Sequence, residues 1–330
     1  MIKNSLNKIT NTNILILCQT TKKLGIDYEI LDWDKYKIRL KKGNKTHLIT
    51  KKSLGLNSTK GIAISRDKHQ TYQTLKLHGL PVLPQIKVKD LADYQRQFKQ
   101  IPFPQVIKPV YGEKGRNIYL NVKTKTEGKI ILSKLFKLSP FVVIEPYFPN
   151  AQDFRFIVLN YQVIGLSQRI PPAITGNRQH TIQQLIHQEN QRRLKLNKKL
   201  GQRMLNRLLI WDRIEWYINQ QGLKLTDTLP KNQTIIVYPI PNFSTGGQVK
   251  TIALNNIHPS FLKMSIKTAQ AIGLIIIGID VLIKDIAQPA VQNNCAIIEV
   301  NSDPGLRLHE WPNQGKPQKV TEKILKFIFP

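Results

Sequence analysis

The sequence predicts an α+β fold built on antiparallel sheets. Patterns typical of strands alternate with helical patterns along the 330 residues, and Asn160-Tyr161 is expected to form a tight hairpin between two apolar strands. Hydrophobic residues make up 41% of the chain and charged residues 22%, which are ordinary values for a folded protein. The chain is too long for one simple core, so we expect two or three packed subdomains.

Short strands and a helix are expected in the first eighty residues. The apolar runs at residues 13–18, 28–32 and 37–40 predict strands. A helix is expected from the N-cap Ser65, with Leu75 and Leu77 turned inward, to a terminating Gly79. Further strands are expected at residues 104–108, 117–122, 141–145, 154–159, 162–166, 278–283 and 295–300, and further helices at residues 91–99, 127–138, 181–189 and 259–272.

Nothing in the composition predicts a membrane or secreted protein, so we expect a cytoplasmic one. The longest apolar stretch, residues 274–283, is much shorter than the ~20 residues that span a bilayer. The N-terminus lacks the apolar core of a signal peptide. The two cysteines, Cys18 and Cys295, are too few for a disulfide framework or for a zinc site of their own.

The charge is strongly basic, with 50 Lys and Arg against 21 Asp and Glu and a net charge of +29. Such a charge attracts polyanions, so nucleic-acid binding is one interpretation. A lysine-rich proteome bias combined with an acidic or nucleotide substrate is the other. The basic residues are scattered along the chain and no nucleic-acid-binding motif is present, so we do not expect a nucleic-acid partner.

Two late strands carry oxygen ligands in apolar surroundings. Asp280 lies in the middle of an apolar run, where an unpaired charge is costly, so it must meet a cation. Glu299 and Asn301 are two residues apart and share one face of the following strand. Together the three offer the hard oxygen ligands that Mg²⁺ prefers, with phosphates and water completing its shell. A solvated edge strand is the alternative for Glu299 and Asn301.

A loop suited to phosphates follows the strand that ends at Lys108. It contains Gly112, Lys114, Gly115 and Arg116, and glycines let backbone N–H groups approach phosphate oxygens. An ordinary hairpin turn is the alternative. A second turn, residues 242–247, combines Ser244 and Thr245 with Gly246 and Gly247. It is consistent with an anion nest for a γ-phosphate or a substrate carboxylate, and equally with a plain turn.

Taken in order, these motifs resemble those of the ATP-grasp carboxylate–amine ligases. More narrowly, residues from about 54 to the end resemble the ATP-grasp domain of cyanophycin synthetase, and more distantly that of bifunctional glutathione synthetases. The stretches that carry the narrower resemblance are Arg169-Ile-Pro-Pro172, His180-Thr-Ile182, Ser244-Thr-Gly-Gly247, Gly278-Ile-Asp280, Ile297-Ile-Glu-Val-Asn301 and Pro304-Gly-Leu-Arg307.

The resemblance implies an ATP-grasp fold, with ATP held between two α+β lobes at residues 61–147 and 148–330 and a short N-terminal α/β segment at residues 1–60. The metal would be Mg²⁺, with Mn²⁺ as an alternative ion, held by Asp280, Glu299 and Asn301. The implied ATP-binding residues are Glu145, Pro146 and Tyr147 as the hinge beside adenine, Asp153 near the ribose, and Lys108, Gly112, Lys114 and Gly115 over the phosphates.

The resemblance also implies a reaction. The γ-phosphoryl group passes to a substrate carboxylate, and an amino acid then attacks the acylphosphate to form an amide or peptide bond. Such chemistry needs positioning and charge neutralisation but no protein nucleophile. Arg169 and Arg307 are the implied catalytic cations, because a guanidinium fork matches oxyanions; solvated surface arginines are the alternative. The implied substrate-binding residues are Ser244, Thr245, Gly246 and Gly247.

Two departures from the relatives concern the acceptor. Residues 237–241 lack the relatives' arginine, and residues 191–206 lack their Arg-Gly and Gly-His pattern, so acceptor identity is not implied. The second stretch is basic and is expected to be helical, with Arg192, Arg193, Lys195, Lys198, Lys199 and Arg203 and no acidic residue. We expect it to steer an acidic peptide acceptor, or else to be a solvated surface helix.

The expected partners are thus ATP, an amino acid and a carboxylate acceptor, and we expect a homo-oligomer. A rival interpretation is a non-catalytic ATP-binding or nucleic-acid-binding protein that retains the fold.

Overall fold

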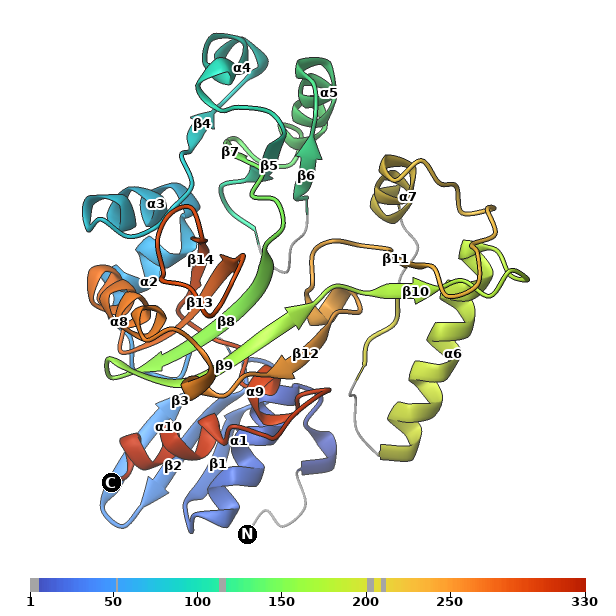
Figure 1. The fold of residues 1–330 in the computed structure, drawn as a ribbon. Coiled ribbons are helices and arrows are strands. Elements are labelled where there is room, and N and C mark those ends of the chain that lie inside the picture. Colours follow the sequence, from blue (N-terminus) through green and yellow to red (C-terminus); the bar gives the residue numbers. More distant parts are fainter. Residues whose placement is uncertain (1–5, 52, 113–116, 201–204, 209–211) are drawn as a thin grey trace.

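The computed structural model describes residues 6–51, 53–112, 117–200, 205–208 and 212–330, and every sheet in this part of the chain is antiparallel (Figure 1). The predicted α+β class is therefore confirmed. In the same ranges, no helix is long and apolar enough to cross a membrane.

A five-stranded sheet forms the centre of the molecule. Its strand order is β12 (Gln248–Thr251), β9 (Gln162–Ile170), β8 (Gln152–Leu159), β13 (Ile276–Ile283) and β14 (Cys295–Asn301). Alternate side chains of β8 face opposite sides of this sheet. Phe154, Phe156 and Val158 pack in a core with the helices α2 (Thr59–Arg66), α3 (Lys68–Leu77) and α8 (Ser260–Ile272).

The opposite face of this sheet joins the N-terminal elements to the C-terminal ones. Ile157 and Leu159 pack in a second core with the helices α1 (Thr12–Lys23) and α10 (Val320–Ile328), and α9 (Arg307–Glu310) lies beside them. The small sheet of β1 (Asp27–Asp32), β2 (Lys37–Lys42) and β3 (Lys45–Ile49) completes this core, and the 3₁₀ helix η1 (Leu6–Lys8) precedes it.

A four-stranded sheet with its own core lies at the other end of the molecule, at the top of Figure 1. Its strands are β4 (Ile86–Val88), β7 (Val142–Pro146), β5 (Gln105–Pro109) and β6 (Tyr119–Val122), covered by α4 (Leu91–Gln97), η2 (Phe98–Gln100) and α5 (Lys125–Leu135). A fourth core belongs to a lateral unit of β10 (Ala173–Thr175), β11 (Thr234–Ile236), α6 (Ile182–Leu200) and α7 (Asp212–Gln220). Two further 3₁₀ turns are η3 (Phe243–Thr245) and η4 (Leu254–Asn256).

Three local predictions are wrong. Residues 13–18 are not a strand but part of α1, capped by the Asn11 side chain. The helix expected at Ser65 begins at Lys68 instead, where Asp67 accepts hydrogen bonds from the N–H groups of the first turn. Leu77 is 85% exposed rather than turned inward. A short apolar run fits a buried helix face as well as a buried strand, which explains the first error.

Candidate active site

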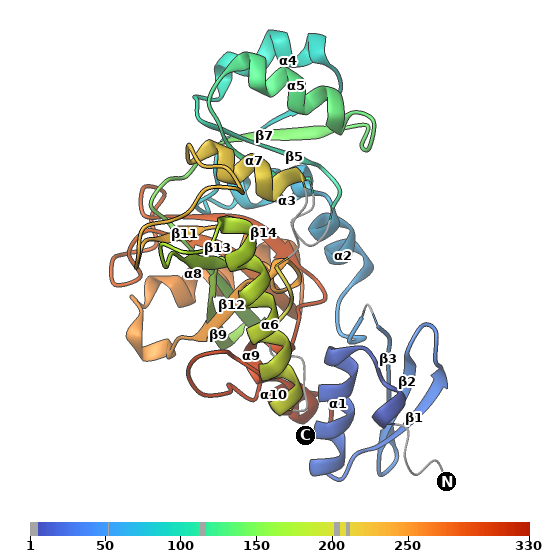
Figure 2. The same ribbon diagram turned by 90° about the vertical axis from the view of Figure 1, so that its right-hand side faces the viewer.

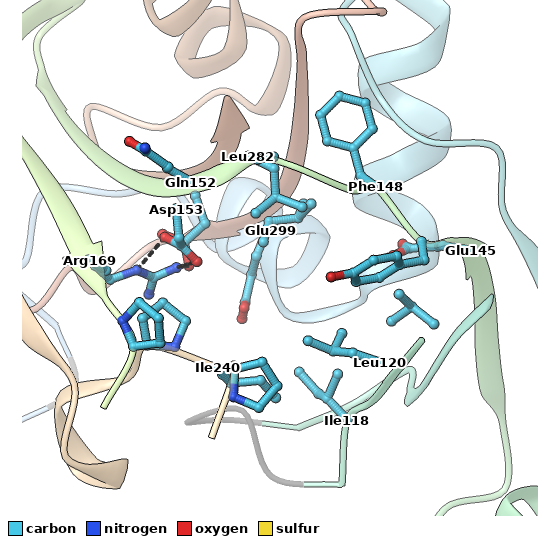
Figure 3. Close-up of a pocket in the computed structure, with 18 of the residues that line it drawn as sticks. Ile118, Leu120, Glu145, Phe148, Gln152, Asp153, Arg169, Ile240, Leu282 and Glu299 are labelled. Atoms are coloured by element: carbon cyan, nitrogen blue, oxygen red, sulfur yellow. Dashed lines mark hydrogen bonds and ion pairs between the residues drawn. The ribbon is translucent and has the colours of Figure 1, made fainter. Parts of the chain in front are cut away.

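A cavity of about 250 Å³ lies between the four-stranded and five-stranded sheets (Figure 3). One wall comes from β5, β6 and β7, and the other from β8, β9, β13 and β14. Figure 3 shows Ile118 and Leu120 on the first wall and Leu282 on the second, with Glu299 extending toward the middle of the pocket. Apolar side chains thus line one end of the pocket, which suits a flat aromatic base, and the charged side chains of Lys108, Asp153 and Glu299 also face it.

The hinge carboxylate Glu145 forms a buried ion pair with Lys108. The distance between Lys108 Nζ and Glu145 Oε2 is 2.7 Å, and the two residues are only 5% and 6% exposed. Gln85 donates to the other oxygen, Glu145 Oε1, at 2.6 Å. The structure therefore places Glu145 beside Lys108, which was predicted to bind phosphates, and sequence reasoning did not foresee this pair. The next hinge residue, Tyr147, donates its backbone N–H to the carbonyl of Pro104 at 2.8 Å.

Lys68 is a second cation close to Glu299, and sequence reasoning missed it. It opens α3, and its Nζ lies 4.0 Å from Glu299 Oε1 and donates to the Gly112 carbonyl at 3.0 Å. Burial lowers the pKa of Lys68, Glu299 opposes this effect, and neighbouring Lys108 adds to it. Its place directly after the helix cap Asp67 was the one local signal available.

The five-stranded sheet buries a network of two carboxylates and two guanidinium groups. Strand pairing sets Asp280 opposite Arg155 and Asp153 opposite Arg169. Arg169 donates to both oxygens of Asp153 at 2.6 and 2.9 Å, and its Nη2 also lies 2.9 Å from Asp280 Oδ2. Arg155 donates to both oxygens of Asp280. These four residues are 2–9% exposed. Two arginines, Arg155 and Arg169, thus provide the positive charge that Asp280 requires, and the contribution of Arg155 was not predicted.

The pKa values of the two carboxylates of this network shift in opposite directions. Burial raises the pKa of Asp153 to about 6, against the opposing effect of Arg169. Burial acts on Asp280 in the same direction, but Arg155 and Arg169 together outweigh it and hold the pKa of Asp280 below its usual value. The pKa of Asp280 is therefore lower than that of Asp153, because Asp280 is bound by two guanidinium groups and Asp153 by one.

The predicted metal ligands lie together at β13 and β14, where Asp280 pairs with Glu299 and Gly278 with Asn301. Glu299 faces the pocket with its side chain 32% exposed. Asp280 Oδ2 accepts from both arginines, so the one remaining position on this carboxylate is on Oδ1. The amide nitrogen of Asn301 is buried without a hydrogen-bond partner in the described residues, which leaves its orientation free to present the oxygen.

These oxygens fit Mg²⁺ only if other ligands complete its shell. Within the described ranges, no group of three or more His, Cys, Asp and Glu side chains could hold a metal by itself. Mg²⁺ usually keeps a few protein oxygens and takes the rest from phosphates and water. Glu299, Asn301 and the free position of Asp280 match that pattern.

The turn at residues 242–247 is tightly bonded internally. The N–H groups of Thr245 and Gly247 donate to the Asn242 carbonyl, and that of Gly246 donates to Phe243. The Thr245 hydroxyl is buried and donates to backbone carbonyls. These N–H groups are therefore used inside the turn, which favours the alternative of a plain turn, and the exposed Ser244 is the member of the predicted set that faces solvent.

Both predicted catalytic arginines reach this turn. Arg307 is 5% exposed, and its guanidinium carbon lies 3.4 Å from the ring centroid of Phe243. Arg169 Nη1 lies 3.3 Å from Asn242 Oδ1. Both side chains are buried, so the alternative of solvated surface arginines is wrong.

The predicted phosphate loop is described in part. Gly112 is exposed, while Lys114 and Gly115 lie outside the described residues. The preceding Tyr111 donates its hydroxyl to Asp67 Oδ2 at 3.1 Å, which ties the start of the loop to the cap of α3.

Two lobes that enclose such a pocket define the class of fold. The structure is similar to a bifunctional glutathione synthetase from Pasteurella multocida, with a TM-score of 0.67 and 23% identity over 96% of this chain and 44% of that one. It is also similar to a D-alanine–D-alanine ligase from Bacillus anthracis, with a TM-score of 0.52 and 15% identity over 82% of this chain and 68% of the ligase. The chain therefore has the ATP-grasp fold, as predicted.

Sequence comparison narrows the relationship. The chain is 31% identical to a cyanophycin synthetase from Synechocystis sp. over 274 residues, which are 82% of this chain and 31% of the relative. It is 28% identical over 326 residues to the glutathione biosynthesis bifunctional protein GshAB of Clostridium perfringens, covering 97% of this chain and 41% of that protein. The predicted resemblance to cyanophycin synthetase is confirmed. The chain spans about a third of the length of the cyanophycin synthetases it matches. No family model matches it.

Proposed function

We propose that the chain is an ATP- and Mg²⁺-dependent ligase that joins a carboxylate to an amino acid through an acylphosphate. The observation that carries the proposal is the pocket itself. It joins an apolar slot at Ile118, Leu120 and Leu282 to the cation Lys108 and the carboxylate Glu299. A nucleotide needs an apolar slot for its base, positive charge for its phosphates and a carboxylate for the metal bound to them. A structure of the Bacillus anthracis ligase in complex with ATP has the same fold.

The residues divide into three roles. The apolar slot takes the adenine, with the hinge residues Glu145, Pro146 and Tyr147 beside it and Asp153 on the ribose side. Lys108 and Lys68 neutralise the phosphates, together with the loop that contains Gly112, Lys114 and Gly115. Glu299, Asn301 and Asp280 hold Mg²⁺, with Mn²⁺ as an alternative ion. When bound, the metal supplies positive charge to the phosphate oxygens.

The reaction then proceeds in two displacements. A carboxylate oxygen of the substrate attacks the γ-phosphorus, and the bond between that phosphorus and ADP breaks. The amino nitrogen of the amino acid next attacks the acyl carbon, phosphate leaves, and the nitrogen loses a proton. Arg307 and Arg169 face the turn at Asn242 and Phe243, where they balance the negative charge that develops.

An acidic peptide is the proposed carboxylate acceptor. Lys195, Lys198 and Lys199 are exposed on α6, on the side opposite the buried Arg193, and they raise the local concentration of an acidic chain. Neighbouring Arg192 is less available to an acceptor, because it donates two hydrogen bonds to Glu189 at 2.7 and 2.8 Å. Assembly as a homo-oligomer and a cytoplasmic location stay predictions from the sequence.

A screen for ADP release tests the function. Each amino acid is added to protein, ATP and Mg²⁺, with and without acidic peptides. We expect release with a subset of amino acids and its loss in Glu299→Ala. Unchanged release in that variant would contradict the metal assignment. Thermal stabilisation by nucleotide without any turnover would favour a non-catalytic ATP-binding protein instead, and tight nucleic-acid binding with a steep salt dependence would favour the other rival.

A further inference from the structure

We propose that Arg193 is a positioning residue, which connects the helix α6 to the substrate side of the pocket by fixing the turn η3. The inference rests on the ligase function proposed above. α6 stands beside the five-stranded sheet, on the side where β12 is the edge strand (Figures 1 and 2). Arg193 is the side chain that reaches from this helix to the turn.

The Arg193 guanidinium makes hydrogen bonds to three separate groups. The residue is 1% exposed, and its Nη1 donates to two backbone carbonyls, those of Gly246 and Asn206, at 2.7 Å each. Its Nε donates to Glu189 Oε1 at 2.7 Å, which balances its charge within the same helix. One guanidinium therefore binds the helix, the segment that follows it and the far end of η3.

The near end of η3 is held by the same arrangement. The Asn206 side chain donates to the Phe243 carbonyl at 3.0 Å, and the Asn206 carbonyl is one of the two that Arg193 binds. The Phe243 ring stacks against the Arg307 guanidinium, and Asn242 contacts Arg169. A displacement of Arg193 therefore shifts the turn that both candidate catalytic arginines touch.

The energetics favour a positioning role over a stabilising one. A buried ion pair contributes little to stability compared with apolar side chains of similar volume. Arg193 Nη2 is buried without a hydrogen-bond partner in the described part of the chain, which adds a further cost. The turn also tolerates little change, because Gly246 has a φ of +92° and a Cβ there would lie 2.3 Å from Leu208 Cδ2. The arginine specifies one conformation of the turn at a cost in stability.

Two variants test the inference: Arg193→Gln removes the charge and shortens the side chain, and Arg193→Lys keeps the charge. Arg192→Gln is the matched control, because Arg192 shares the partner Glu189 but is exposed. Amide hydrogen exchange is measured in the peptide covering residues 242–249, and steady-state kinetics in the ADP-release assay. We expect exchange in this peptide to rise about tenfold or more and kcat to fall about tenfold to a hundredfold in Arg193→Gln, with the KM for ATP unchanged. Arg193→Lys should recover part of both losses.

Two results would overturn the inference. One is that hydrogen exchange and kinetics in Arg193→Gln equal those of Arg192→Gln. The other is that exchange becomes faster across the whole chain and the KM for ATP rises with it. The exchange comparison decides the matter even if the parent protein releases no ADP, a result that would count against the ligase function itself.

Discussion

The two walls of the pocket hold their charges differently. The wall from the five-stranded sheet carries Asp153, Arg155, Arg169 and Asp280 in one buried network, in which each carboxylate is bound through both oxygens. The opposite wall carries the buried pair of Lys108 and Glu145. Lys68, at the start of α3, lies 4.0 Å from Glu299 and is not in hydrogen-bond contact with it.

The difference indicates a division of labour. Charges in the network compensate one another before any ligand binds, which preorganises that wall. Lys68 and Glu299 are each incompletely compensated, so they are the groups best able to take up phosphates and metal. We therefore expect changes to the network to affect folding first, and changes to Lys68 and Glu299 to affect ligand binding first.

The largest effect is expected from Arg169→Gln. This change leaves Asp153 without its guanidinium partner and removes one of two partners from Asp280, so it should lower the free energy of unfolding by about 3–5 kcal/mol. The control is Arg39→Gln, which breaks an exposed pair with Glu29 and should cost about 0–1 kcal/mol. Urea unfolding at pH 7 measures both. Equal costs for the two variants would show that the buried network is not a special feature of this wall.

The two lysines should separate stability from binding. Lys68→Gln and Lys108→Gln each remove a positive charge from the proposed phosphate site, which should raise the KM for ATP about tenfold to a hundredfold. Lys108→Gln alone should also lower the melting temperature, because it leaves the buried Glu145 without its cation. The double variant Lys108→Gln/Glu145→Gln should regain stability but not ATP affinity. A normal KM for ATP in Lys68→Gln would contradict the role assigned to Lys68.

The pKa of His309 reports how well water is excluded from the wall that carries the buried charge network. His309 lies behind β9, where its Nδ1 contacts Gln318 and Ser167, and burial lowers its pKa to about 4. Between pH 6.5 and 4 the unfolded chain binds a proton that the native protein does not, so His309 lowers stability as the pH falls through this window. From pH 7 to 5, the parent should lose about 2 kcal/mol more than His309→Gln. Parallel pH profiles in urea unfolding would mean that His309 titrates normally.

The smallest effect is expected on α6, which belongs to neither wall. Changing Lys195, Lys198 and Lys199 to Gln should raise the KM for an acidic acceptor a few-fold and remove its salt dependence, with the KM for ATP unchanged. Changing Lys129, Lys134 and Lys137, which are exposed on and just after α5, alters the net charge equally and serves as the control. If the two triple variants behave alike, α6 contributes only to the overall charge.

Much of the candidate site could be read from the sequence, because buried charges and hard oxygen ligands have local signatures. Asp280 in an apolar strand required a cation, and the structure supplies Arg155 and Arg169. The identity of that cation could not be read, since it depends on which strands pair. Arg155 is itself a lone charge in the apolar run 154–159. Each of the two residues therefore needs a partner of opposite charge, and strand pairing sets them opposite one another.

Other features had weaker signals. Lys68 lies on a helix whose start was misplaced at Ser65, and its place directly after Asp67 is a weak signal among the many lysines of the chain. The composition of residues 242–247 was consistent with an anion nest and equally with a plain turn, and the structure shows that the turn uses its own N–H groups internally. Composition predicts that a turn forms, but it does not predict which carbonyls its N–H groups bind.

The most direct test of the proposed reaction follows the carboxylate oxygen. The substrate found in the amino-acid screen is prepared with ¹⁸O in its carboxylate and incubated with the protein, ATP, Mg²⁺ and the second substrate, and the phosphate released is analysed by mass spectrometry. Formation of an acylphosphate predicts that each phosphate released carries one oxygen from the carboxylate, in proportion to the ¹⁸O content of the substrate. Phosphate free of ¹⁸O, released at the normal rate, would contradict the account.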